Sequence, residues 1–314
     1  MFKINDQLKK DFNTFWNFIQ KADKITICTH IEPDGDTLGT AIALQELINL
    51  NLKDKNVKIS GGDYPRNISF LIDEPISLVS DDFFQQSLKV VVDTSTKRRI
   101  YDQRVKTEES IKFDHHHNEG EWLFGIGGDF WPATGEALVL LINEIGLRVN
   151  PKIITALAVA ILTDTENLVE RNISDQTFLC MAYLMQNGLN YQDTIRKLSL
   201  NDDEKTQIFR YLNMKKTIDG IDVLLVNELV TNDIARPLAA LFTSFSSSGV
   251  CFLLLKKKDG NYRGEIRSKE MFDVSQVASF FGGGGHFHSA GFILDDINRH
   301  QEVVNKINEL KMKN

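Results

Sequence analysis

Short runs of apolar and β-branched residues alternate with helical runs through the first half of the chain. The strand-like runs lie at residues 24–30 (KITICTH), 56–60 (NVKIS), 87–95 (SLKVVVDTS) and 111–117 (IKFDHHH). The helical runs lie at residues 37–52, 133–147 and 151–164. We expect Thr37 to be the N-cap of the first helix. Strands that alternate with helices form a parallel sheet with helices on both faces, so this pattern predicts an α/β fold.

The second half of the chain predicts a second, smaller α/β domain. Two strand-like runs within residues 250–268 are joined across Asp259-Gly260, a dipeptide typical of hairpin turns. Residues 187–220 are polar and helical, and we interpret them as a linker. A length of 314 residues also exceeds what one hydrophobic core usually supports. We therefore expect domains at residues 1–186 and 221–314, with a helical linker at 187–220.

The composition is that of a globular protein, with 42% hydrophobic and 25% charged residues. Residues 1–20 lack the apolar core and cleavage site of a signal peptide, and the longest apolar run, at 153–162, is about half a membrane span. The cysteines are Cys28, Cys180 and Cys251, all in apolar runs without C-x-x-C spacing. This usage favours reduced core thiols, so we expect a cytoplasmic protein without a membrane partner.

The segment after the first predicted strand, HIEPDGD, places Asp34 and Asp36 on either side of Gly35. Like charges this close repel and raise each other's pKa, so a divalent cation is the first candidate for what offsets the repulsion. We expect Gly35 to allow a tight turn that aims both carboxylates at one site. A lone DGD sequence is more often a solvated turn, so this assignment needs support from other segments.

Support comes from polar residues that follow other predicted elements. They are His30 after the first strand, Asp93 after the third, Asp114, His115 and His116 after the fourth, and Asp164 at the end of an apolar helix. Ligands of parallel sheets bind beyond the carboxyl ends of the strands. Each residue alone is more often a cap or turn residue, but together they predict a dinuclear metal site. Aspartate and imidazole favour Mn²⁺ or Mg²⁺, and two ions roughly 3.5–4 Å apart stabilise in-line displacement at phosphorus.

Four motifs, HIEPDGDTLG, VVDTS, DHH and LTDT, follow one another in the order of the motifs of the DHH phosphoesterase superfamily. The later segments RGEIRS and FGGGGHFHSAGF are similar to the DHH-associated substrate-binding domain. It is the type found in the branch that degrades short RNA and 3′-phosphoadenosine 5′-phosphate (pAp). The resemblance covers residues 20–295. It implies a DHH catalytic domain at 1–186 and a DHH-associated substrate-binding domain at 221–314.

The resemblance also implies roles for residues in the first domain. One metal ion would be held by His30, Asp34 and Asp93, and the other by Asp36, Asp93, His115 and Asp164, with Asp93 bridging. His116 would face the substrate phosphate or leaving group, and Asp114 would orient a histidine. Arg99 stands where the family tends to carry a phosphate-contacting arginine; beside Lys97 and Arg98, the alternative is a surface charge.

Three positions depart from the family pattern. His117 replaces a proline, and Thr163 and Glu166 replace glycines. His117 is either a spare ligand or a solvated side chain, and Glu166 either contacts metal or substrate or caps its loop. These departures put substrate preference in doubt more than metal binding, because Asp164 is present.

The C-terminal glycine run, Gly282 to Gly285, precedes His286. Glycine lets backbone N–H groups approach a phosphate closely, although such a run is also typical of a flexible hinge. By the resemblance, the substrate contacts would be Arg267, Ser268, Gly283, Gly284, Gly285 and His286. Basic residues crowd the hairpin before the run, where the alternative is an edge strand protected by lysines.

We therefore expect a phosphoesterase with two Mn²⁺ ions, Mg²⁺ or Co²⁺ being alternatives, that hydrolyses short RNA oligonucleotides to 5′-mononucleotides. Further candidate substrates are pAp and linear dinucleotides. A net charge of −7 argues against binding long duplex DNA. The alternatives are a pyrophosphatase or exopolyphosphatase-like enzyme and a catalytically weak nucleotide-binding sensor. Cleavage polarity, substrate preference and homodimer formation stay open.

Overall fold

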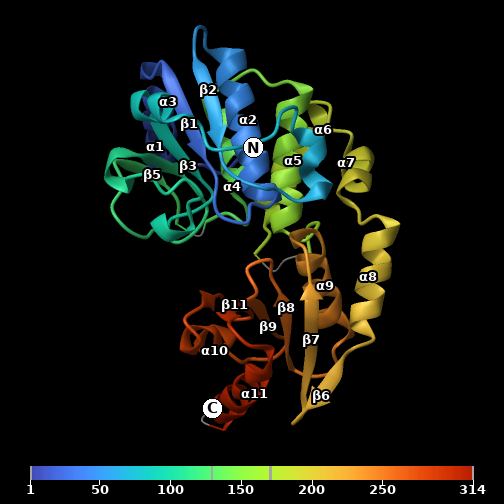
Figure 1. Cartoon of the computed structure of the whole chain (residues 1–314). Coiled ribbons are helices and arrows are strands. Elements are labelled where there is room, and N and C mark those ends of the chain that lie inside the picture. The colour runs from blue at the N-terminus through green and yellow to red at the C-terminus, as the bar shows by residue number, and fades with distance from the viewer. Residues whose placement is uncertain (1, 129, 170–171, 313–314) are drawn as a thin grey trace. The chain divides into compact units, whose positions relative to one another are not determined.

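The computed structural model describes residues 2–128, 130–169 and 172–312, and the chain divides into two compact units at residues 1–199 and 200–314 (Figure 1). The helices of the first unit are α1 (Asp6–Lys21), α2 (Gly35–Asn51), α3 (Asp81–Gln86), α4 (Thr134–Ile145), α5 (Pro151–Asp164), α6 (Asp175–Gln186) and α7 (Tyr191–Leu198). Its strands are β1 (Lys24–Cys28), β2 (Asn56–Ser60), β3 (Leu88–Val92), β4 (Ile111–Phe113) and β5 (Phe124–Ile126).

The first unit contains a five-stranded sheet in the order β2-β1-β3-β4-β5, and all its neighbouring strands are parallel. Alternate side chains of the strands enter two cores. Ile27 and Val90 join α1, α2, α4 and α5 on one face, whereas Cys28 and Val91 join α3 on the other. The parallel α/β fold predicted from the sequence is confirmed, although the short strand β5 was not predicted.

Helix α2 differs from its prediction in where it begins and in why it needs a glycine. It begins at Gly35 with Asp34 as its N-cap, two residues before the predicted start, so the assignment of Thr37 as N-cap is wrong. A Cβ atom on Gly35 would lie 2.3 Å from Oγ1 of Thr163. Gly35 therefore allows α2 and α5 to pack closely rather than forming a tight turn.

The second unit is smaller and has a mixed sheet. Its helices are α8 (Asp202–Leu212), α9 (Asn232–Phe245), α10 (Val274–Phe280) and α11 (His300–Lys311). Its strands are β6 (Lys216–Ile218), β7 (Ile221–Leu229), β8 (Val250–Lys256), β9 (Tyr262–Ser268), β10 (Gly284–Gly285) and β11 (Ser289–Leu294), in the sheet order β10-β11-β9-β8-β7-β6. The predicted hairpin is the antiparallel pair β8 and β9, and among the described strands of this second sheet only β7 and β8 pair in parallel.

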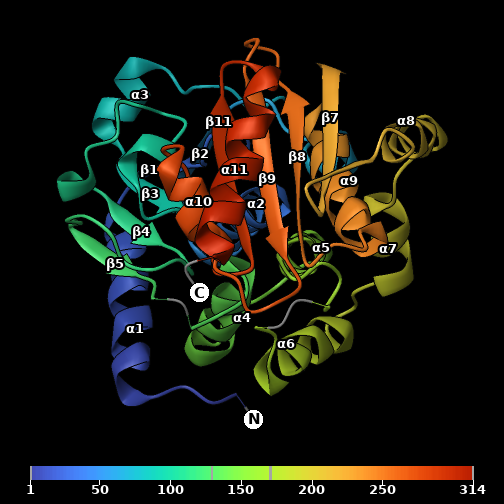
Figure 2. The same ribbon diagram turned by 90° about the horizontal axis from the view of Figure 1, so that it is seen from below.

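Helices cover both faces of this second sheet. α10 and α11 pack on one face, and Figure 2 shows α11 in front of β9 and β11. α8 and α9 pack on the other face. All three cysteines are buried free thiols, as expected. In the described parts of both units, every helix is too short or too polar to cross a lipid bilayer.

Candidate metal centre

Asp34 lies at the junction between β1 and α2. Its Oδ1 accepts hydrogen bonds from the backbone N–H groups of Asp36 and Thr37, at 3.1 and 3.2 Å. These bonds satisfy donors that the first turn of a helix leaves free. Its Oδ2 lies 3.6 Å from Nε2 of His30. One carboxylate therefore both caps the helix and presents an oxygen to the residues after β1.

His30 is fixed in orientation by the backbone. Its Nδ1 lies 2.9 Å from the carbonyl oxygen of Ile31, so Nδ1 donates and Nε2 faces the carboxylates. Nε2 lies 3.3 Å from Oδ2 of Asp93. Burial acts to lower the pKa of His30, but the carboxylates of Asp34 and Asp93 outweigh it and raise that pKa to about 10. Positive charge is therefore favoured at this point, whether a proton or a cation supplies it.

Asp36 is fully buried and is held by the first turn of α4. The backbone N–H groups of Thr134 and Gly135 donate to its two oxygens at 2.6 and 2.9 Å. The positive end of the helix dipole favours a carboxylate there. Burial raises the pKa of Asp36 well above its usual value, and the charges of Asp93 and Asp164 raise it further. A cation between these groups would relieve that repulsion.

Asp93 stands between the two histidines. It follows β3 with a φ of 59°, a left-handed conformation that aspartate tolerates better than most residues. Its Oδ2 faces His30, and its Oδ1 lies 3.4 Å from Nε2 of His115. The hydroxyl of Thr134 donates to the same Oδ1 at 2.9 Å. Each oxygen of this carboxylate is thus directed toward a different histidine.

The surroundings of the His115 ring nitrogens bear most directly on metal binding. Its Nδ1 lies 3.0 Å from the carbonyl oxygen of Trp131, which leaves Nε2 as the nitrogen that faces the carboxylates. Nε2 lies 3.4 Å from Oδ2 of Asp164 and 3.9 Å from Oδ2 of Asp36. It is nevertheless buried without a hydrogen-bond partner. A buried nitrogen surrounded by carboxylates and left without a hydrogen bond is what a divalent cation would satisfy.

The ligand atoms fall into groups whose members lie within 4.8 Å of one another. These groups are His30, Asp34 and Asp93; Asp36, His115 and Asp164; and Asp93, His115 and His116. The first two are the sets predicted for the two ions, apart from the bridging residue in the second. Carboxylate and imidazole ligands without thiolate suit Mn²⁺ or Mg²⁺, so the residues present fit two such ions. Which atoms bind metal stays a prediction.

Asp114 and His116 form a hydrogen-bonded pair beside these groups. Oδ1 of Asp114 accepts from Nδ1 of His116 at 2.7 Å and from its backbone N–H at 3.1 Å. Burial acts to raise the pKa of Asp114, but the hydrogen bond and charge of His116, the bond from Ser95 and the charge of Lys112 together outweigh it and hold that pKa well below its usual value. Burial likewise acts to lower the pKa of His116, but the hydrogen bond to Asp114 and the charges of Asp93 and Asp114 raise it to about 9. Asp114 therefore sets the orientation of His116, and Asp114 and Asp93 together favour its charged form.

Arg99 and the three departures lie around this centre. The exposed Arg99 ends the short 3₁₀ helix Lys97–Arg99, and its charge acts to lower the pKa of His116, so the two are electrostatically coupled. His117 and Glu166 are exposed, and Glu166 has a left-handed φ of 46°, which suits glycine better. Thr163 instead packs against Gly35.

The predicted substrate residues other than Arg99 lie in the second unit. Arg267 contacts Glu265 over 2.9 Å, and the hydroxyl of Ser268 donates to the carbonyl oxygen of Glu270 at 2.8 Å. Sequence reasoning missed Glu265, which lies on the same face of β9 as Arg267 and partly neutralises its charge. The roles of Arg267 and Ser268 in substrate binding stay predictions.

The glycine run has a structural role of its own. Gly284 and Gly285 form β10, which pairs with Gly291 and Ala290 of β11. A Cβ atom on Gly283 would lie 2.1 Å from the carbonyl oxygen of Gly291, so this glycine is needed for the pairing. Gly284 has open space around it, and His286 is exposed. Among these residues, Gly284 and His286 are the ones whose surroundings leave most room for a ligand.

Sequence reasoning missed several residues that support the centre. They are Ser95, Lys112, Trp131 and Thr134, which contact Asp114, Ser95, His115 and both Asp36 and Asp93, respectively. A lysine inside the apolar strand IKF was a signal for Lys112. The sequence carried no such signal for Thr134 and Trp131, because their contacts depend on where the start of α4 lies in the folded structure.

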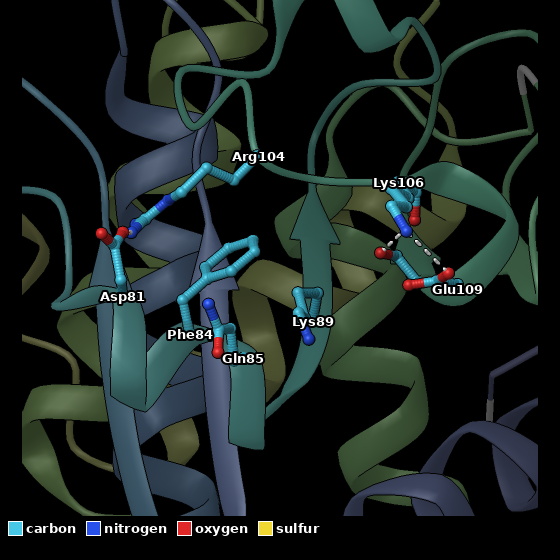
Figure 3. Close-up of a pocket in the computed structure, with 8 residues that line it drawn as sticks. Asp81, Phe84, Gln85, Lys89, Arg104, Lys106 and Glu109 are labelled. Atoms are coloured by element: carbon cyan, nitrogen blue, oxygen red, sulfur yellow. Dashed lines mark hydrogen bonds and ion pairs between the residues drawn. The ribbon is translucent and has the colours of Figure 1, made fainter.

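A separate pocket of about 300 Å³ lies at the other end of the first sheet, near the start of β3 (Figure 3). Its basic side chains already have partners in the protein. Arg104 pairs with Asp81, and Lys106 lies 3.1 Å from Glu109. Lys89 donates to the carbonyl oxygen of Ser87 at 2.8 Å. These internal pairings leave little charge to bind an anion, so we assign no ligand to this pocket.

Comparisons with known proteins agree with these motifs. Residues 220–313 match the DHHA1 domain family. The bifunctional oligoribonuclease and PAP phosphatase NrnA of Mycoplasma pneumoniae is 28% identical over 88% of this chain and 89% of its own length. The chain belongs to the DHH phosphoesterase superfamily. An uncharacterized protein of Mycoplasma genitalium, MG371, is also similar to this DHH protein, with 27% identity over 97% of this chain and 96% of its own length.

A solved structure supports the fold assignment for this DHH phosphoesterase. An exopolyphosphatase-related protein from Bacteroides fragilis has a TM-score of 0.85 and covers 98% of both chains at 18% identity. At this level of identity the likeness shows the shared fold alone.

Proposed function

We propose that this DHH protein is a two-metal phosphoesterase that hydrolyses short RNA oligonucleotides to 5′-mononucleotides and also pAp to AMP. The observation that carries the proposal is Nε2 of His115, buried among three carboxylates without a hydrogen bond. The relative from Mycoplasma pneumoniae is named for the same two activities. Its similarity extends over both units, which favours a nucleotide substrate over pyrophosphate.

Two ions held by His30, Asp34, Asp36, Asp93, His115 and Asp164 would supply Lewis-acid stabilisation of the phosphoryl oxygens. In the hydrolysis, water adds to phosphorus and the ribose oxygen leaves with a proton. His116 is the candidate donor of that proton, because Asp114 engages its Nδ1 and leaves Nε2 for the substrate. Arg99, Arg267, Ser268, Gly283–Gly285 and His286 are the candidate phosphate-binding residues.

Product analysis tests this proposal. The purified chain with Mn²⁺ is incubated with a 5′-labelled RNA dinucleotide, with pAp and with pyrophosphate. We expect labelled 5′-mononucleotide from the first and AMP with phosphate from the second, both abolished by a chelator. Cleavage of pyrophosphate in preference to both nucleotides would replace the proposal with a pyrophosphatase. Nucleotide binding without turnover of any substrate would indicate a sensor.

A further inference from the structure

Lys112 is a buried lysine that the proposed mechanism does not use. It is 2% exposed and lies in the middle of β4. Its neighbours Ile111 and Phe113 enter the larger core, so Lys112 and Asp114 point to the opposite face of the strand. Burying an ammonium group is costly unless it is paired and hydrogen-bonded. The contacts of Lys112 show where it is paired.

A continuous chain of polar contacts runs from Lys112 to His116. Nζ of Lys112 donates to Oγ of Ser95 at 2.7 Å and lies 3.5 Å from Oδ2 of Asp114. Ser95 in turn donates to this same Oδ2. The other oxygen of Asp114, Oδ1, accepts from Nδ1 of His116 at 2.7 Å. One oxygen of Asp114 thus faces the lysine and serine, and the other faces the histidine.

The neighbouring strand leaves space for this lysine. Lys112 lies opposite Gly125 of β5 in the parallel register. A Cβ atom on Gly125 would lie 2.9 Å from Cγ and Cε of Lys112, and one on Gly127 would lie 3.0 Å from Nζ. The ring of Trp122 lies on the same face, with its centroid 5.8 Å from Nζ. A side chain at either glycine position would displace Lys112. The two glycines therefore leave the space that the lysine side chain occupies.

We propose that Lys112 is a positioning residue for His116. Through Ser95 it holds the carboxylate of Asp114, and Asp114 fixes the His116 ring so that Nε2 remains available to the substrate. A neutral side chain at position 112 would leave the buried carboxylate of Asp114 with one cation fewer. The carboxylate and the ring would then lose their fixed positions. The catalytic consequence rests on the proposed function, whereas the structural consequence can be measured without turnover.

A double-mutant cycle tests the route through Asp114. We expect Lys112→Met to lower kcat by roughly 10- to 100-fold, the range for groups that orient the residues of a metal site, with KM and Mn²⁺ content near wild type. In the Asp114→Asn background, Lys112→Met should change kcat by no more than about twofold, because the group it acts on is gone. An equal loss in both backgrounds would overturn the proposal.

A matched control separates this effect from the loss of any strand lysine. Lys89 lies on the adjacent strand β3. Its Nζ donates to the carbonyl oxygen of Ser87 and so takes no part in the hydrogen bonds that connect Lys112 to His116. Lys89→Met should therefore keep wild-type kcat. A loss as large as that of Lys112→Met would show that strand lysines act through stability alone and would overturn the proposal.

Nuclear magnetic resonance gives a readout that does not depend on turnover. In the Mg²⁺-loaded chain labelled with ¹⁵N-histidine, the Nδ1 proton of His116 should resonate downfield and exchange slowly, because Asp114 accepts it. His116→Asn assigns the signal. In Lys112→Met the signal should move upfield and exchange faster, and Ser95→Ala should do the same if Lys112→Met does not fold.

An unchanged His116 signal in both variants would overturn the positioning role. A wild-type chain that turns over no phosphoester, but whose His116 signal still depends on Lys112 and Ser95, would refute the proposed function and support the positioning role. The failures of the two proposals are therefore distinguishable.

Discussion

The backbone N–H of Thr134 donates to Oδ2 of Asp36 at 2.6 Å, so the first turn of α4 holds a carboxylate that lies 98 residues earlier in the chain. The hydroxyl of Thr134 donates to Asp93 at 2.9 Å. A single residue therefore contacts two of the clustered carboxylates through two different groups. This separation of backbone and side-chain roles can be tested by substitution.

Thr134→Val should remove the hydroxyl contact to Asp93 and keep the backbone contact to Asp36. A hydrogen bond to a charged group is worth roughly 1.5–3 kcal/mol, so we expect kcat/KM to fall by roughly 10- to 100-fold. Thr134→Ser keeps the hydroxyl and should stay near wild type. Steady-state kinetics on an RNA dinucleotide measure both, and a larger loss in Thr134→Ser than in Thr134→Val would point to packing of the methyl group instead.

Asp93→Asn should abolish most turnover and reduce the metal content. Asparagine keeps the size of the side chain and tolerates the left-handed φ of 59°, so the change removes mainly the charge directed at His30 and His115. Asp54 has nearly the same φ, 58°, at an exposed position, so Asp54→Asn is the matched control. Elemental analysis of dialysed protein should show fewer than two Mn²⁺ per chain only for Asp93→Asn. Full metal content and activity in that variant would refute the bridging role.

The sequence predicted where the polar residues of the centre lie because parallel strands end at a shared edge. Asp93 and His115 follow neighbouring strands, β3 and β4, so their proximity follows from the strand order once the sheet is recognised. The supporting contacts could not be predicted in the same way. Thr134 and Trp131 come from the segment around the start of α4, and no periodicity in the sequence reports how that segment packs against Asp36 and His115.

The errors in the predicted elements also have physical causes. Helix α2 begins earlier than predicted because Asp34, which was assigned only to metal binding, is also the N-cap. The strand β5 is three residues long and has Gly125 at its centre, so it is too short, and too poor in strand-forming residues, to indicate a strand. The reason for a glycine at position 125 is visible only in the structure, where the side chain of Lys112 fills the space that a Cβ atom would need.

Gly35→Ala should destabilise the first unit, because the added methyl group would overlap Thr163 of α5. Overpacking of this kind costs about 1–3 kcal/mol in the free energy of unfolding. Thr163→Gly removes the three atoms nearest to that methyl group and should restore part of the loss in the double variant. Urea unfolding measures the cycle, with Gly284→Ala as a control whose Cβ meets open space. Additive losses in the double variant would contradict the direct contact.

The hydrogen-bonded carboxylate of Asp222 should make the stability of the second unit depend on pH. Its buried carboxylate accepts from Thr217 at 2.7 Å and from Ser246 at 2.8 Å. Burial acts to raise the pKa of Asp222, but these bonds and Lys215 outweigh it and hold that pKa well below its usual value. A depressed pKa in the folded state means that the carboxylate stabilises the fold above about pH 4 and that this stabilisation is lost as the pH falls further.

Asp222→Asn should therefore lower the free energy of unfolding by about 2 kcal/mol at pH 7. The difference from wild type should shrink as the pH falls below about 4, because the wild-type carboxylate then gains a proton. Urea unfolding from pH 3 to 7 gives the comparison, with the exposed Asp219→Asn as the control. A difference that stays constant over this range would mean that the charge of Asp222 is not what stabilises the unit.

The cations of the second unit predict how activity depends on RNA length. Several of the basic residues near the glycine run are engaged within the protein: Lys257 lies 3.4 Å from Asp259, Arg267 lies 2.9 Å from Glu265, and Lys269 donates to the carbonyl oxygen of Ser246. With a net charge of −7 as well, the chain lacks the diffuse attraction that holds long polymers.

A substrate of a few nucleotides therefore gains little when further phosphates are added. We expect initial rates on 5′-labelled RNAs to fall beyond roughly five nucleotides, because the extra phosphates meet no matching basic track. The rates are compared from two to twenty-four nucleotides at one ionic strength and one molar concentration of RNA ends. Raising the salt concentration is the control, since weak dependence on salt is expected for substrates that contact few cations. Rates that climb steadily with length, and that fall steeply with salt, would instead indicate a nuclease that tracks long strands.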